Sequence, residues 1–143
     1  MILDAHNMFS SAQAVTATAA SDNLIDLGAI RNVGVGQPLY LLIVCTVAMT
    51  DSGSDSTVAV TVESDDNASF SSATTAQTIG TFSAVSPAGT KLVAVIQPNA
   101  VNERYIRLKY TVAGGNLTTG SFSAYLAESL DLFTAYADAI TIS

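Results

Sequence analysis

The chain has 143 residues, which is the usual length of one domain. Only 12% of its residues are charged, and Glu and Lys, the common residues of helix surfaces, are almost absent, so the composition argues against a helical fold. The formal net charge is −7 with 5 Lys and Arg residues, which argues against direct binding to nucleic acid or to an anionic membrane.

The first 22 residues predict an N-terminal arm rather than a strand of the core. Ala and Thr dominate from residue 12 to residue 20, but large apolar side chains lie close to the start of the chain. A solvated arm would not need so many of them, so we expect this arm to pack either on its own domain or on a partner. The apolar residues concerned are Met1, Ile2, Leu3, Met8 and Phe9.

Seven segments after this arm have the length and pattern of β-strands, with turn residues between them. They span residues 24–30, 39–49, 57–63, 77–82, 90–97, 104–113 and 121–126. The segment 39–49 is apolar on both faces, whereas a strand of a two-sheet sandwich needs only one apolar face. Its second face must therefore be covered by an arm, a loop or another subunit. The same run is too short to cross a membrane, which takes about 20 apolar residues.

The regular spacing of these segments predicts the fold class. Apolar and polar residues alternate most clearly in segments 57–63 and 104–113, as in strands with one buried face. We expect an all-β fold, an antiparallel jelly roll or β-sandwich of about eight strands, in a single domain over residues 1–143. Its body is expected over residues 23–127. Residues 128–143 are expected to form a C-terminal arm, whose large apolar residues include Leu132, Phe133 and Tyr136.

Residue types that carry out catalysis are scarce in this chain. His6 is the single histidine and lies in the predicted N-terminal arm, where a general base could not be held rigidly beside a nucleophile. Cys45 falls inside a predicted strand with no basic residue nearby, so we expect a buried apolar side chain rather than a reactive thiol. Two groups of acidic residues lie in predicted turns, and their spacing does not match a calcium-binding loop. We therefore expect no enzymatic activity, no cofactor and no metal site.

Four of the 5 basic residues are clustered in the last part of the predicted body. Arg107 and Lys109 share the outward face of one predicted strand with Tyr105. Two interpretations stay open for this positive stripe. Its side chains could pair with acidic residues of the same molecule, or they could bind an acidic patch on a protein partner, with Tyr105 adding apolar contact area.

Short motifs spread over nearly the whole chain carry a family resemblance. In order, they are Met1-Ile-Leu-Asp-Ala-His6, Ala14-Val-Thr-Ala17, Asn23-Leu-Ile-Asp-Leu-Gly28, Gly36-Gln-Pro-Leu-Tyr40, Val60-Thr-Val-Glu-Ser-Asp-Asp66 and Glu103-Arg-Tyr-Ile-Arg-Leu-Lys-Tyr110. With this order and spacing, the chain resembles the head cement, or decoration, proteins of tailed phages, of the Bordetella short-tailed-phage type.

The resemblance implies a jelly-roll protein on the outer surface of an icosahedral capsid, without enzymatic activity. Such a protein would bridge neighbouring capsomers of the major capsid protein and stabilise the head against the pressure of the packaged DNA. It would act as a homo-oligomer, for which we expect a dimer, with a trimer as the alternative. The residues expected to contact partners are Met1, Ile2, Leu3, Met8, Phe9, Tyr105, Arg107, Lys109, Leu132, Phe133 and Tyr136.

Two other function classes were weighed against a capsid cement protein. A carbohydrate-binding β-sandwich module on a virion surface usually displays aromatic side chains for stacking on sugars, but the chain has no Trp and its 5 Tyr residues are scattered. A jelly-roll enzyme of the cupin kind needs a cluster of metal-binding histidines, and the chain has 1. The carbohydrate-binding module is kept as the alternative.

Overall fold

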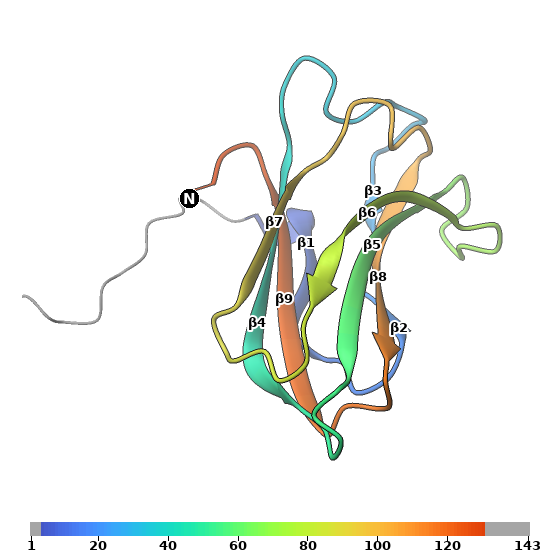
Figure 1. Ribbon diagram of the computed structural model, residues 1–143. Coiled ribbons are helices and arrows are strands. Elements are labelled where there is room, and N and C mark those ends of the chain that lie inside the picture. Colours follow the sequence, from blue (N-terminus) through green and yellow to red (C-terminus); the bar gives the residue numbers. More distant parts are fainter. Residues whose placement is uncertain (1–3, 131–143) are drawn as a thin grey trace, which may run out of the picture.

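The computed structural model describes residues 4–130. These residues form a short 3-10 turn at Ala5–Asn7 and nine strands (Figure 1). The strands are β1 (Met8–Ala14), β2 (Ala19–Ala20), β3 (Ile25–Asp26), β4 (Tyr40–Thr50), β5 (Thr57–Asp65), β6 (Thr74–Phe82), β7 (Lys91–Val95), β8 (Tyr105–Ala113) and β9 (Thr119–Ala127). The predicted all-β fold is therefore confirmed.

The strands build two antiparallel sheets that pack face to face (Figure 1). One sheet has the order β1-β9-β4-β7, and the other has the order β2-β8-β5-β6 with β3 also paired to β8. The pairings are nested: β5 pairs with β6, β4 with β7, β2 and β3 with β8, and β1 with β9. Successive pairs alternate between the two sheets, which is the winding of a jelly roll. Because β2 and β3 occupy one position beside β8, the nine strands fill eight positions.

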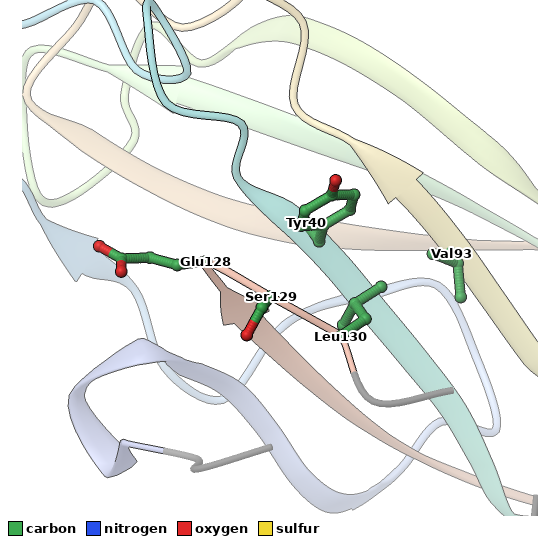
Figure 2. Close-up of a pocket in the computed structure, with 5 residues that line it drawn as sticks. All are labelled: Tyr40, Val93, Glu128, Ser129 and Leu130. Carbon is green, nitrogen blue, oxygen red and sulfur yellow. The ribbon is translucent and has the colours of Figure 1, made fainter. Parts of the chain in front are cut away.

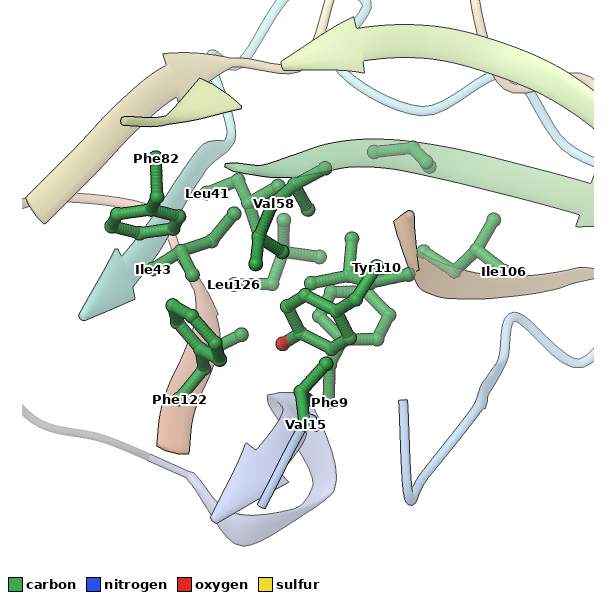
Figure 3. Packing of buried hydrophobic residues seen from close by; sticks show 14 of the residues in the cluster. Phe9, Val15, Leu41, Ile43, Val58, Phe82, Ile106, Tyr110, Phe122 and Leu126 are labelled. Atoms are coloured by element: carbon green, nitrogen blue, oxygen red, sulfur yellow. The ribbon is translucent and has the colours of Figure 1, made fainter. Parts of the chain in front are cut away.

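The core lies between the sheets and is made by every second residue of the long strands. Figure 3 shows the aromatic centre of this core, where the Phe122 ring lies 4.9 Å from that of Phe82 and 5.5 Å from that of Tyr110. The inward residues of β4 include Leu41 and Ile43, which are fully buried. Strand alternation thus places one apolar set in the core and leaves the other set on the outer faces of the sandwich.

Residues 8–20 pack on their own domain, which is one of the two alternatives expected for the N-terminal arm, but the expectation that they contain no strand of the body is wrong. Strand β1 pairs with β9, and Phe9 and Val15 are each 1% exposed in the core. The backbone N–H of Val15 donates to the carbonyl of Gly120 at 2.9 Å. Register shifts along β1, together with a positive φ of 48° at Ala12, break the period of two that would have marked a strand in the sequence.

The first strand predicted after the arm is also shorter than expected. Of the segment 24–30, only β3 is a strand, and the chain leaves the sheet at Gly28, whose φ is +77°. A residue with a side chain adopts this conformation only under strain, so Gly28 ends the strand where the loop up to β4 begins. The six other predicted strands are observed, with ends shifted by up to a few residues.

Candidate interaction surfaces

The predicted positive stripe is paired with a carboxylate of the same molecule. Glu63, which is only 6% exposed, lies on β5 directly opposite Arg107 on β8. Arg107 binds the carboxylate of Glu63 at 2.8 Å, and the ammonium group of Lys109 lies 3.5 Å from the same carboxylate. The guanidinium of Arg107 also stacks over the Phe70 ring at 4.2 Å. Of the two interpretations, pairing within the molecule is the one observed.

Tyr105 lies beside a second ion pair near the start of β8. Arg104 donates two hydrogen bonds of 2.8 Å to the carboxylate of Asp26, and its guanidinium lies 5.0 Å from the centre of the Tyr105 ring. The hydrogen bond from Arg104 is the main reason why the pKa of Asp26 falls to about 2. Tyr105 is half-buried in this arrangement, so it adds little free apolar area to the stripe.

The acidic residues at the end of β5 organise a loop. Asp65 is buried and accepts hydrogen bonds from the backbone N–H groups of Asn67 and Ser72 at 2.9 and 2.8 Å. Burial raises the pKa of Asp65, but these hydrogen bonds outweigh it and hold the pKa below its usual value. The neighbouring Asp66 has a raised pKa, mainly through its contact with Asp65. Within residues 4–130, no group of three or more His, Cys, Asp or Glu side chains is placed to hold a metal ion.

His6 and Cys45 lie in different surroundings in the fold. His6 is exposed in the 3-10 turn before β1. Cys45 is fully buried in β4, where burial raises the pKa of its thiol. A thiol with a raised pKa in the core is a poor nucleophile, so these two residues form no reactive pair. In the described part of the chain, no helix is long and apolar enough to cross a membrane.

The outer face of the sheet β1-β9-β4-β7 carries an apolar patch at the end of the sheet where β4 begins and β9 ends. The register aligns Met8, Tyr125, Leu42 and Val93 in one row that crosses the sheet from β1 to β7. The next row contains Ala127, Tyr40 and Val95. Leu42 is 6% exposed, but Val93 and Val95 at the edge are 43% and 44% exposed. We call these seven residues the apolar face.

The opposite side of the sandwich has a different chemical character. On the sheet β2-β8-β5-β6, the outward positions of β5, β6 and β8 carry mainly Thr and paired charged residues. Thr78 and Thr81 lie there on the edge strand β6 and are exposed. An isolated sandwich is expected to be polar on both outer sides. The apolar face is therefore the side that is suited to contact with another protein surface.

The segment that follows β9 lies over the edge of the apolar face. Figure 2 shows Leu130 close to Tyr40 and Val93, with Glu128 and Ser129 leading to it from β9. These five residues line an open hollow of about 360 Å³. The hollow is open and most of its lining surface is apolar, so it offers apolar contact rather than a site for chemistry.

The remaining predicted contact residues divide into three groups. Met8 is half-buried on the apolar face, whereas Phe9 points into the core and cannot reach a partner in this fold. The other six lie outside the described residues, in segments 1–3 and 131–143, and stay predictions: Met1, Ile2, Leu3, Leu132, Phe133 and Tyr136.

Val93, Val95 and Tyr125 were not predicted from the sequence as residues of this surface. The second apolar face of the segment 39–49 was expected to need a cover. Residues 91–95 alternate in the sequence, and this alternation places Val93 and Val95 on the same side of the strand as Lys91. That pattern could have predicted that these two valines are surface residues. Only the pairing of β7 and β9 with β4 joins these residues into one surface.

The comparison with known families covers the whole sandwich. The family model Bbp16 matches residues 9–126, from β1 to the end of β9. No curated protein matches the chain. The matched region includes β1, in agreement with the place of that strand in the body. The chain thus belongs to the Bbp16 family, whose name points to a protein of a Bordetella phage.

Proposed function

We propose that the protein is a structural component of the virion, a cement protein that binds the outer surface of the capsid. It would bridge neighbouring capsomers of the major capsid protein and stabilise the DNA-filled head, without a catalytic step. The observation that carries this proposal is the apolar face on one side of a sandwich whose other side is polar. Membership of a phage family and the resemblance to head cement proteins support the same role.

The apolar face fits attachment to a large protein surface. Removing apolar surface from water contributes about 25 cal/mol per Å², so even a few exposed side chains provide useful binding energy. Val93 and Val95 lie on the edge strand β7, where a partner can reach them. A protein that contacts two capsomers at once gains further, because the second contact forms within the same complex. Modest contacts of this kind are sufficient for a protein that is present in many copies.

The sandwich supplies the stiffness that a bridging protein needs. Its core is closed by aromatic contacts, and all buried side-chain N and O atoms within residues 4–130 have hydrogen-bond partners. A densely packed body transmits force between its contact points instead of deforming. We further propose that the protein acts as a homo-oligomer, with a dimer as the expected state and a trimer as the alternative.

The proposal is tested by binding to phage heads that lack this protein. We expect the full chain to co-sediment with empty heads and to reach saturation. The double variant Val93→Asp/Val95→Asp should bind at least tenfold more weakly, because it places two charges on the apolar face. The matched control is Thr78→Asp/Thr81→Asp, which adds the same charges to the exposed edge strand of the other sheet.

Three results would count against the proposal. The full chain could fail to bind heads, or the two double variants could bind equally well. Binding that is competed by free glycans, with no affinity for heads stripped of glycans, would favour the carbohydrate-binding alternative.

A further inference from the structure

We propose that residues 131–143 of the same chain lie over the apolar face in the free protein. The inference goes beyond capsid attachment, since it concerns the protein before it meets any partner. Three covers were expected for the second apolar face of strand β4: an arm, a loop or another subunit. The proposal selects the C-terminal arm. The observation that supports the proposal is that Leu130 lies beside Tyr40 and Val93 (Figure 2).

The direction of the chain is the first argument. Strand β9 ends at Ala127, in the outer row of the apolar face. Residues 128–130 follow β9 and line the same hollow as Tyr40 on β4 and Val93 on β7. Leu130 already contributes an apolar side chain to the hollow above the face. The described part of the chain therefore ends beside this surface.

The length of the remaining segment is the second argument. Thirteen residues follow Leu130, and an extended chain of that length reaches about 40 Å. Three strand spacings of about 4.8 Å separate β1 from β7, so the segment is long enough to cross the sheet or to run along its edge. The tether also keeps the segment near the face at an effective concentration of about 1 mM or more.

The composition of the segment is the third argument. Large apolar residues make up much of it, and its charged residues are acidic. Lys91 lies on the same side of β7 as Val93 and is exposed, so the edge of the apolar face offers a positive charge to an acidic segment. The apolar residues of the segment are Leu132, Phe133, Tyr136, Ile140 and Ile142, and its acidic residues are Asp131 and Asp138.

The direct test uses the full chain and nuclear Overhauser effects between side chains. We expect contacts from the ring protons of Phe133 and Tyr136 to the methyl groups of Leu42, Val93 and Val95. A sample that mixes isotope-labelled and unlabelled chains shows whether the contacts arise within one chain. Contacts within one chain support the proposal. Contacts only between chains would mean that a second copy covers the face, and the absence of contacts would mean that nothing from this segment does.

An apolar dye gives an independent readout without any capsid. We expect the variant Phe133→Asp/Ile140→Asp to increase dye fluorescence several-fold, because the segment no longer covers the apolar face. The control Thr134→Asp/Thr141→Asp adds the same charges to the same segment and should leave the fluorescence unchanged. Equal fluorescence of the two variants would overturn the proposal. Such a failure would leave the binding to heads untouched, so the two proposals fail separately.

Discussion

At the scale of single residues, Tyr110 joins the two sheets by a polar contact inside the core. Its hydroxyl lies 2.9 Å from the hydroxyl of Ser10 on β1, and the residue is fully buried. Burial raises the pKa of Tyr110 to about 12 from the usual value near 10. The neutral phenol is therefore the form that the fold requires. This contribution to stability is complete below pH 10 and is lost as the pH rises through 12.

The variant Tyr110→Phe tests this pH dependence. The wild-type protein should lose about 2 to 3 kcal/mol of its free energy of unfolding between pH 9 and pH 12 through this residue, as a shift of two units implies. Tyr110→Phe should be less stable by about 1 kcal/mol at pH 8, since one hydrogen bond is lost, and should not show the alkaline loss. Urea unfolding at both pH values measures the difference. The control Tyr125→Phe should keep the alkaline loss, and an equal loss in Tyr110→Phe would contradict this account.

Asp65 organises the loop after β5 at the same scale. The variant Asp65→Asn keeps the shape of the side chain but weakens its bonds to Asn67 and Ser72. We expect the melting temperature to fall by a few degrees, whereas the exposed Asp66→Asn should change it little. Because the pKa of Asp65 is lowered in the fold, its contribution is present above the pKa of the unfolded chain and is lost on acidification. Equal melting temperatures of the two variants at pH 7 would show that Asp65 does not hold the loop.

At the scale of strands, β1 is the element whose role differs most from the expectation. The exchange of Phe9 for Ala removes a ring that is 1% exposed, and we expect a loss of about 3 to 5 kcal/mol in the free energy of unfolding. Ser11→Ala on the same strand is exposed and should stay within about 0.5 kcal/mol of the wild type. Chemical denaturation measures both. Comparable stability of the two variants would mean that β1 is a detachable arm after all.

The sequence could predict the strands in which alternation is regular, and it failed where the period is broken. Strands β5 and β8 alternate without interruption over their central residues, so their place and their inward faces follow from the pattern alone. In β1 the register shifts twice, and small residues replace the expected large ones, so no period of two is visible. The apolar face was predicted only in part, because its rows are assembled from four strands that are distant in sequence.

The pairing of charged residues across strands was open in the sequence for a similar reason. Glu63 and Arg107 are separated by 43 other residues, and only the register of β5 with β8 places them opposite each other. Once paired, Arg107 and Lys109 are no longer available as a free positive stripe. The choice between an internal ion pair and an acidic partner thus depended on strand register, which alternation alone does not determine.

At the scale of the whole molecule, the two outer sides of the sandwich differ in chemical character. The side formed by β2, β3, β8, β5 and β6 is polar, with its charges paired, and suits contact with solvent. The side formed by β1, β9, β4 and β7 carries the apolar face, which suits contact with protein. A stiff body with one such side can be held between larger subunits. The proposed role on the capsid and the proposed cover in the free protein both follow from this asymmetry.

The central claim is that attachment of this protein makes a phage head more stable. The most direct measurement is the temperature at which DNA-filled heads lacking the protein break down, recorded with increasing amounts of the purified full chain. We predict that this temperature rises and then levels off when the binding sites are filled, and that Val93→Asp/Val95→Asp gives a much smaller rise than Thr78→Asp/Thr81→Asp. A breakdown temperature that does not change when the protein is bound, or heads that bind none of it, would contradict the claim.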